Sequence, residues 1–310
     1  MQLKKSADKT CVYTAIITPF TEHLSIDFAS LSNLLREQEE IGNGVLILGS
    51  TGEALNLSME QRKQIVLYTM ELNLDVPVMV GIGGVQLQAQ LEWISWLNRQ
   101  AVHSYLLVTP LYSKPGKEGQ VQWFECLMDA SERPCMLYNV PGRTGVELDP
   151  EALHSLQHHK NAWAVKEAGG CPKNLRKYIQ KAPSLKFFCG DDILVDDFIK
   201  AGAVGLVSVA SNSWPEITLR LVQQLLQGRR EKLPEEFRRA AQSLFLASNP
   251  VPVKALLFEL GKINSPLMLP PLSHEDLYHV GPVLASHTQL IPILEELRQQ
   301  DDKELGHAVA

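Results

Sequence analysis

The chain repeats one pattern eight times: a short apolar run rich in β-branched residues, followed by a longer segment with helical periodicity. Such alternation is typical of β/α units, which build a parallel sheet. The runs begin about 20 to 35 residues apart, the length of one β/α unit. We therefore predict eight strands, at residues 12–17, 44–48, 78–82, 104–108, 135–138, 162–165, 186–189 and 205–209.

Eight strands favour a closed barrel over an open doubly wound sheet, and no G-x-G-x-x-G motif follows the first strand. After the eighth run the sequence indicates helices only, which prolines interrupt. We expect an α/β fold, a (β/α)8 TIM barrel with a C-terminal helical extension. Residues 1–213 would form the barrel strands and the catalytic mouth, and residues 214–310 the last barrel helix and the extension.

Composition excludes several classes of protein. The formal charge is −6 and the basic residues are scattered, so we expect no nucleic-acid partner. No apolar run approaches the roughly 20 residues that span a bilayer, so we expect no membrane insertion. The five cysteines include no C-x-x-C pair, which suits a reducing, cytoplasmic compartment.

Lys166 follows the sixth apolar run directly. Active sites of β/α barrels form at the C-terminal ends of the strands, so this side chain would rise from the barrel core into the mouth. Burial disfavours the ammonium form, and a neutral amine in a dry pocket attacks carbonyls to give a Schiff base. The alternative is a buried ion pair with a neighbouring glutamate, which taken alone is the commoner arrangement.

Other strand ends carry groups that such chemistry needs. Tyr138 ends the fifth run and could serve as a general acid and base. Ser50 and Thr51 offer hydroxyls for a proton relay, although both could instead cap a helix. Arg143 lies in a glycine-flanked loop, and its planar fork suits a substrate carboxylate. A surface salt bridge is the alternative for Arg143.

Two other groups of side chains are weaker candidates for metal ligands. His154, His158 and His159 lack an H-E-x-x-H pattern and a further ligand. Asp191 and Asp192 could bind Mg²⁺, but the pair is also typical of a helix N-terminus, which we prefer. We therefore expect no metal.

Five stretches occur in an order and spacing that resembles one family: AIITPF at residues 15–20, GSTGE at 49–53, YNVPGRTG at 138–145, KEA at 166–168 and NPVPVK at 249–254. Together they resemble the pyruvate-dependent class I lyases of the dihydrodipicolinate synthase and N-acetylneuraminate lyase family. The resemblance covers most of the chain. It implies that Lys166 holds pyruvate as a Schiff base, with no cofactor and no metal.

The same resemblance assigns roles to the other candidates. Tyr138 would be the proton-transfer partner, and Ser50 and Tyr112 would complete a hydroxyl relay. In the family the tyrosine matching Tyr112 reaches into the site of a partner subunit, which implies a homotetramer made of two tight dimers. The pyruvate end would be held by Thr51 and by the main chain near Gly190 and Val207.

Arg143 in its P-G-R-T-G context resembles the synthase branch, in which this arginine binds the carboxylate of aspartate semialdehyde. The resemblance thus implies condensation of pyruvate with L-aspartate 4-semialdehyde, on the path to diaminopimelate and lysine. One alternative is an aldolase of the same family that cleaves N-acetylneuraminate or a keto-deoxy sugar acid. Another is a barrel that binds a keto acid without catalysis, although such a module needs no desolvated amine.

This chain departs from the family pattern at several positions. Ser50 stands where a threonine is usual, which implies modestly slower turnover because the rotamer-fixing methyl is missing. Leu111 replaces a tyrosine, and Gly170 replaces a hydroxyl residue. We also predict weak or absent inhibition by lysine, because the positions that bind it in inhibited members offer few polar contacts here: Met59, Arg62, Val85, Ala89 and Leu111.

Overall fold

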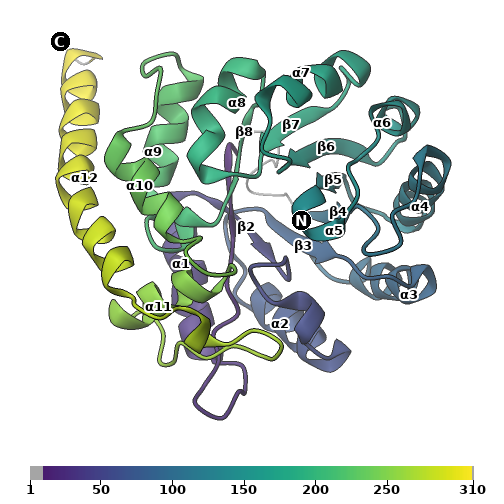
Figure 1. Cartoon of the computed structure of the whole chain (residues 1–310), viewed down its shortest axis with the longest axis horizontal. Helices are drawn as coiled ribbons and strands as arrows, with labels where there is room; N and C mark the ends of the chain where they lie inside the picture. The colour runs from purple at the N-terminus through teal and green to yellow at the C-terminus, as the bar shows by residue number, and fades with distance from the viewer. Residues whose placement is uncertain (1–9, 309–310) are drawn as a thin grey trace.

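The computed structural model describes residues 10–308, and the side chains of residues 10–299. Within this part of the chain, eight parallel strands close into a barrel in sequence order (Figure 1). The predicted β/α barrel is confirmed, and no predicted strand end is wrong by more than two residues. The strands are β1 (Val12–Ala15), β2 (Gly44–Ile47), β3 (Val78–Ile82), β4 (Ser104–Val108), β5 (Cys135–Asn139), β6 (Ala162–Glu167), β7 (Lys186–Cys189) and β8 (Gly205–Ser208).

Helices surround the barrel on its outside (Figure 1). Those between the strands are α1 (Phe28–Ile41), α2 (Met59–Glu71), α3 (Leu87–Leu97), α4 (Lys117–Ala130), α5 (Pro141–Thr144), α6 (Pro150–Leu156), α7 (Pro172–Lys181) and α8 (Val195–Ala201). After β8 come α9 (Pro215–Leu226), α10 (Glu235–Ser243), α11 (Val251–Glu259) and α12 (Gly281–Ala308). Short 3-10 turns are η2 (Ala54–Asn56), η3 (Asp192–Leu194), η4 (Ala210–Asn212) and η5 (His274–Asp276).

Several helices begin where polar side chains satisfy their first free amides. Ser58 accepts a hydrogen bond from the amide of Gln61, and the Gln61 side chain returns one to Ser58, which completes a capping box before α2. Asp27 accepts from the amide of Ser30 at the start of α1. Asp149 caps α6 in the same way. These local signals fix where each helix leaves the mouth of the barrel.

The apolar core has two layers, because successive strand residues face opposite sides of the sheet. The larger layer packs between the strands and the helices. The smaller one fills the barrel interior, with Tyr13, Ala15, Leu46, Met79, Leu106, Met136, Tyr138, Val140, Ala164, Phe188 and Val207. The inside of the barrel is therefore packed, and the space available for a ligand lies above it.

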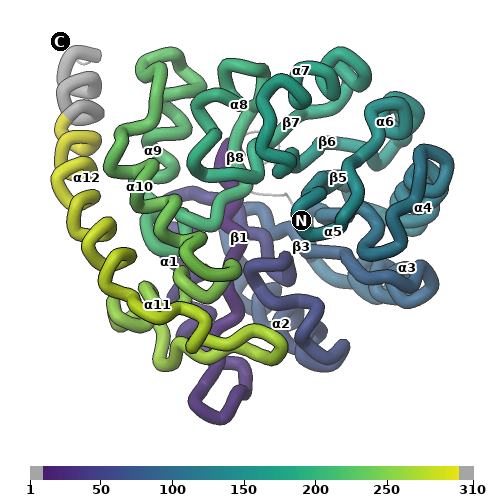
Figure 2. The backbone as a smooth tube through the Cα atoms, viewed as in Figure 1, coloured from purple at the N-terminus to yellow at the C-terminus, as the bar shows by residue number. Residues whose placement is uncertain are grey.

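After β8, α9 packs against α1, α8 and the strands β1 and β8 as the last barrel helix, and α10, α11 and α12 form the extension. The boundary that we expected at residues 213 and 214 lies between η4 and α9. The helix α12 packs against α9 and α10 along one side of the barrel (Figure 1). Between α11 and α12 the chain passes the loop after β2, where Asn56 donates to the carbonyl of Leu269 at 3.4 Å (Figure 2). In residues 10–308, no helix is long and apolar enough to cross a membrane.

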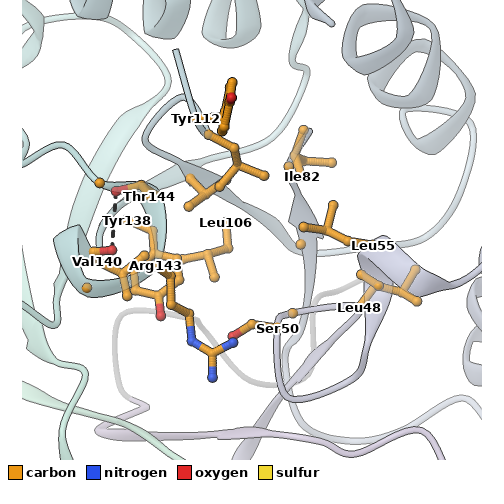
Figure 3. A pocket seen from close by; sticks show the side chains of 18 of the residues that line it. Leu48, Ser50, Leu55, Ile82, Leu106, Tyr112, Tyr138, Val140, Arg143 and Thr144 are labelled. Atoms are coloured by element: carbon orange, nitrogen blue, oxygen red, sulfur yellow. Dashed lines mark hydrogen bonds between the residues drawn. The ribbon is translucent and has the colours of Figure 1, made fainter. Parts of the chain in front are cut away.

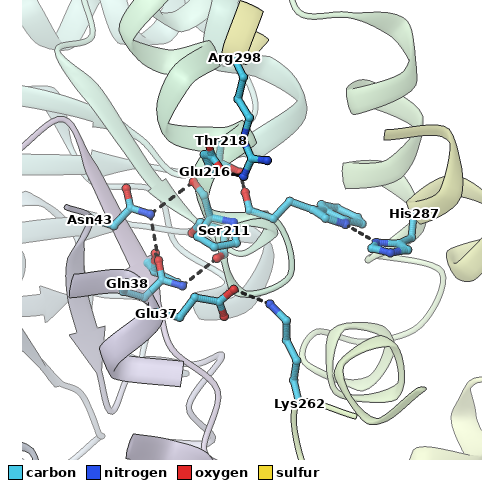
Figure 4. A network of polar contacts seen from close by, with 12 residues as sticks. Glu37, Gln38, Asn43, Ser211, Glu216, Thr218, Lys262, His287 and Arg298 are labelled. Carbon is cyan, nitrogen blue, oxygen red and sulfur yellow. Dashed lines mark hydrogen bonds and ion pairs between the residues drawn. The ribbon is translucent and has the colours of Figure 1, made fainter. Parts of the chain in front are cut away.

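Polar contacts tie the extension to the barrel (Figure 4). Lys262, beyond α11, forms an ion pair of 2.6 Å with Glu37 on α1. Trp214, before α9, donates to Nδ1 of His287 on α12 at 2.9 Å. The extension is therefore attached to the rest of the chain at two separate places, beyond α11 and on α12.

Candidate active site

A cavity of about 940 Å³ lies at the C-terminal ends of β2, β3, β4 and β5. Four of the eight predicted site residues line it, namely Ser50, Tyr112, Tyr138 and Arg143 (Figure 3). The other four, Lys166, Thr51, Gly190 and Val207, are not part of its lining. The location confirms that the polar strand ends gather at one mouth, and the remaining residues must be placed from their own contacts.

Lys166 and Tyr138 are brought together by the pairing of β5 with β6, in which they are direct register partners. The Lys166 Nζ lies 4.4 Å from the centre of the Tyr138 ring. Both side chains are buried, with 5% of Lys166 and 8% of Tyr138 exposed. Lys166 lies within β6 rather than after it, so its backbone is held by strand pairing on both sides. Lys166 therefore contacts Tyr138, which lines the cavity, without lining the cavity itself.

The ion pair considered for Lys166 is absent. Glu167 faces the other side of β6, where its carboxylate accepts from Asn139 Nδ2 at 2.7 Å and from the amide of Gly169 at 2.7 Å. Burial raises the pKa of Glu167 to about 7. Among the side chains of residues 10–299, no carboxylate lies within salt-bridge distance of Lys166. Lys166 is therefore a buried amine without an ion pair, and the Asp192 carboxylate interacts with it electrostatically from beyond salt-bridge distance.

Gly190 permits close packing beside the lysine. A Cβ at Gly190 would lie 3.0 Å from Lys166 Cε and 2.7 Å from the Cβ of Ala168, so any larger residue would displace its neighbours. The amide of Gly190 donates to the carbonyl of Glu167 at 2.8 Å. Val207 is fully buried in the inner layer of the barrel. Both predicted residues thus lie on strands or loops next to β6 or β1, around the base of the mouth.

The loop after β2 does not cap a helix through Ser50 or Thr51, so that interpretation is wrong. The 3-10 turn η2 begins at Glu53 without a side-chain cap, and α2 is capped by Ser58. The Thr51 hydroxyl instead accepts from Asn249 Nδ2 at 2.9 Å. Asn249 comes from the extension just before α11, and no role was predicted for it from the sequence.

Arg143 extends from α5 across the cavity (Figure 3). Its Nη2 donates to the carbonyl of Asn249 at 3.2 Å. Among residues 10–299 it forms no ion pair, so the surface salt bridge considered for it is absent. An arginine that lines a cavity and keeps most of its donors free is suited to bind a carboxylate.

Tyr112 is the most exposed of the predicted residues, at 89%. Its backbone lies in the left-handed region, with a φ of 66°, and its ring points away from Tyr138 (Figure 3). Within the described chain, no hydrogen bond joins Ser50, Tyr112 and Tyr138. A single subunit therefore leaves the relay unassembled.

The lining of the cavity is positively charged. It includes the side chains of Arg62, Lys114 and Arg143, and none of the described residues that line it is acidic. Burial lowers the pKa of Arg62. Clefts lined by one sign of charge concentrate ligands of the opposite sign, so this cavity favours small anions. Lys114 was not predicted as a lining residue, because nothing in the sequence marks a loop lysine as close to the cavity before the loop is folded.

A buried ion pair supports the loop that carries Ser50 and Thr51. Lys254 Nζ lies 2.7 Å from Glu53, and both side chains are fully buried. The second carboxylate oxygen of Glu53 accepts from the amide of Leu269 at 2.9 Å. Burial raises the pKa of Glu53 and lowers that of Lys254 to about 8. The sequence signal was available, because Lys254 stands inside an apolar helix where an unpaired charge would be costly.

The two aspartates after β7 make different contacts. Asp191 accepts from the amide of Ile193 and caps η3, as predicted. Asp192 also lies at the start of η3, as predicted, but its side chain does not cap the turn and accepts instead from the Ser208 hydroxyl at 2.5 Å and the amide of Val209 at 2.9 Å. Asp192 is buried, and its three hydrogen-bond donors all come from residues 208–210 at the end of β8. Among the described residues, no cluster of three or more His, Cys, Asp or Glu side chains is arranged to hold a metal.

The fold and the site define a β/α barrel suited to lysine-based carbonyl chemistry: a buried unpaired amine, a phenol packed against it and an anion-attracting cavity. The model of the dihydrodipicolinate synthetase family matches residues 8–280. The chain belongs to this family.

Individual relatives agree with the family match. The 4-hydroxy-tetrahydrodipicolinate synthase of Francisella philomiragia is 47% identical over 269 residues, which cover 86% of this chain and 90% of that protein. The synthase of Wolbachia pipientis from Culex pipiens is 40% identical over 298 residues, 96% of this chain and 97% of that one. The chloride-inhibited dihydrodipicolinate synthase of Acinetobacter baumannii, solved with pyruvate, is 28% identical with a TM-score of 0.84 over 91% of this chain and 97% of that chain.

Proposed function

We propose that this chain catalyses the 4-hydroxy-tetrahydrodipicolinate synthase reaction, in which pyruvate condenses with L-aspartate 4-semialdehyde on the path to diaminopimelate and lysine. The observation that carries the proposal is Lys166, a buried amine without an ion pair that packs against Tyr138. The names of the relatives support this reaction over cleavage of sialic or sugar acids. A barrel that only binds keto acids would not need such an amine.

In the proposed reaction the Lys166 amine attacks the keto carbon of pyruvate and water leaves, which gives an imine. Loss of a proton from the methyl carbon gives an enamine, whose carbon then attacks the aldehyde of the second substrate. Tyr138 contacts Lys166 and would therefore carry out these proton transfers. The amino group of the second substrate then displaces Lys166 from the imine carbon and closes the ring. Lys166 itself supplies the reactive group, so the proposal includes no cofactor.

Carboxylate binding completes the proposal. Arg143 lines the cavity with free donors and would bind the carboxylate of aspartate semialdehyde. Thr51, with the main chain near Gly190 and Val207, would hold the carboxylate of pyruvate beside Lys166. The positive lining of the cavity supports two anionic substrates.

We also propose an oligomeric state and a cellular compartment for the enzyme. A cytoplasmic homotetramer of two tight dimers would let Tyr112 of one subunit join Ser50 and Tyr138 of its partner. The strong exposure of Tyr112 supports a contact of this kind. Inhibition by lysine would be weak or absent, since Met59 and Val85 at the relevant positions present exposed apolar side chains.

The test is mass spectrometry of the protein after borohydride reduction with pyruvate present, on the wild type and on Lys166→Ala. We expect a pyruvate adduct at Lys166 in the wild type and none in the variant. Lys160→Ala is the matched control, because Lys160 is exposed just before β6 and should keep the adduct. A wild type without adduct would overturn the proposal. Aspartate semialdehyde and N-acetylmannosamine, compared as acceptors, then distinguish the synthase from a sialic-acid lyase.

A further inference from the structure

Asn249 connects two of the substrate-binding groups. Its side-chain Nδ2 donates to the Thr51 hydroxyl at 2.9 Å, and its main-chain carbonyl accepts from Arg143 at 3.2 Å. Thr51 and Arg143 come from different barrel loops, whereas Asn249 comes from the extension, 198 residues after Thr51. Asn249 is only 5% exposed. One residue of the extension thus holds both loops in place at once.

The direction of the bond between Asn249 and Thr51 decides what the hydroxyl can do. A hydroxyl has one hydrogen to donate and can accept through its lone pairs. Because Thr51 accepts from Asn249, its own hydrogen is not used in this bond, and within residues 10–299 no other group takes it. An accepted hydrogen bond also strengthens the hydroxyl as a donor. Thr51 is therefore prepared to donate to an anion.

The side-chain oxygen of Asn249 indicates that this asparagine has a functional rather than a packing role. The Oδ1 atom is buried and has no hydrogen-bond partner among the described residues. A buried unpaired oxygen costs free energy, and native structures contain few of them. An apolar residue of similar size would avoid that cost but could not donate to Thr51. The asparagine is thus unfavourable for packing and useful for orienting the hydroxyl.

We infer that Asn249 is a positioning residue that makes Thr51 a hydrogen-bond donor to the pyruvate carboxylate and holds the Arg143 guanidinium through its main-chain carbonyl. This inference rests on the proposed function. It assigns to the extension a direct part in binding the first substrate, through a residue that itself touches no reacting atom.

The experiment measures the pyruvate concentration that gives half-maximal borohydride-trapped adduct, which needs no second substrate. In Asn249→Asp, the carboxylate would accept the Thr51 hydrogen and remove it from pyruvate, so we expect the half-maximal concentration to rise about 10-fold or more, the range for a hydrogen bond to a charged group. Asn249→Ala leaves the hydroxyl free to donate but unoriented, and should raise it by only about 3-fold. Asn73→Asp is the matched control, because Asn73 is exposed beyond α2.

Thr51→Val separates hydrogen-bond direction from charge. Adding Asn249→Asp to Thr51→Val should change the half-maximal concentration little, because the hydroxyl that it acts on is gone. An unchanged 10-fold rise in this background would mean that the added charge acts directly on pyruvate, and would overturn the inference. The inference would also be overturned if Asn249→Asp had the same half-maximal pyruvate concentration as the wild type. If the wild type itself traps no pyruvate, the proposed function fails rather than this inference.

Discussion

Lys166 and Glu167 are neighbours in sequence but face opposite sides of β6. Lys166 faces Tyr138 inside the barrel, while Glu167 faces outward and accepts from Asn139 on β5. The two inner residues and the two outer residues are consecutive register pairs. The outer hydrogen bond therefore joins β5 and β6 at the level where the amine and the phenol meet, in addition to their backbone pairing. The ionised form of Glu167 is held by two donors, yet its burial makes that form costly.

Replacement of Glu167 by glutamine should change how stability depends on pH. The pKa of Glu167 is raised from 4.5 to about 7, so its contribution to the stability of the fold is fully present below about pH 4.5 and is lost as pH rises through 7. The wild type should lose on the order of 3 kcal/mol relative to Glu167→Gln over this range. Urea denaturation of both proteins at pH 5 and pH 8 measures the difference.

Glu71→Gln, which makes the same change at an exposed site on α2, serves as the control. Equal pH dependence in the wild type and Glu167→Gln would contradict the prediction. Retention of the pyruvate adduct in Glu167→Gln would separate this effect on stability from the chemistry at Lys166.

Some single residues could be predicted from the sequence and others could not. Lys166 and Tyr138 follow from their places at the ends of apolar runs, because a barrel directs such residues to its mouth. The role of Asn249 depends on contacts with Thr51 and Arg143, which lie far away in sequence. No local pattern encodes such a contact. The ion pair between Lys254 and Glu53 could be predicted only in part. The sequence shows a charged residue, Lys254, inside an apolar helix, but it does not show that Glu53 is its partner.

At the scale of elements, that ion pair joins the loop after β2 to α11. Two opposite charges removed from water gain stability only while both are present. Glu53→Ala leaves the Lys254 ammonium buried without a partner, and should lower the free energy of unfolding by about 3–5 kcal/mol. The double variant Glu53→Leu with Lys254→Met should recover most of this loss, because no unpaired charge remains buried.

Chemical denaturation of the wild type, the single variant and the double variant tests this expectation. Glu37→Ala, which removes the partly exposed ion pair to Lys262, is a matched control and should cost less than about 1 kcal/mol. A Glu53→Ala loss no larger than that of Glu37→Ala would contradict the role assigned to the buried pair.

The elements themselves were predictable where their signals were local. Eight strands were visible as apolar runs, each followed by a segment with helical periodicity. The one-turn helix α5, which carries Arg143, gave no periodic signal because it has only four residues. The course of the segment around Leu269, which returns to Glu53, was equally hidden. Such segments are set by tertiary contacts rather than by local propensity.

At the scale of the whole molecule, exposed apolar side chains lie near the cavity, and within the described part of one subunit nothing covers them. Leu55 and Tyr112, which line the cavity, and Val85, which does not, follow three neighbouring strands, β2, β3 and β4, and all three are strongly exposed. Grouped apolar side chains on a surface typically mark a contact with another protein. A second copy of the chain placed over these side chains would cover them and bring a second Tyr112 towards the cavity. This arrangement supports the proposed dimer and would complete the hydroxyl relay.

Mixing two inactive variants tests whether Tyr112 acts in the site of the partner subunit. In a mixed dimer of Lys166→Ala and Tyr112→Phe, one site lacks both groups, but the other has Lys166 from one subunit and Tyr112 from the other. After mild denaturation and random reassembly of equal amounts, about half of the two-fold dimers should be mixed, and each mixed dimer has one intact site. About a quarter of all sites should therefore contain both Lys166 and Tyr112. The measurement is synthase activity of the mixture against each variant refolded alone. If Tyr112 acted within its own subunit, no mixed dimer would contain an intact site, and the mixture would be no more active than the average of its components.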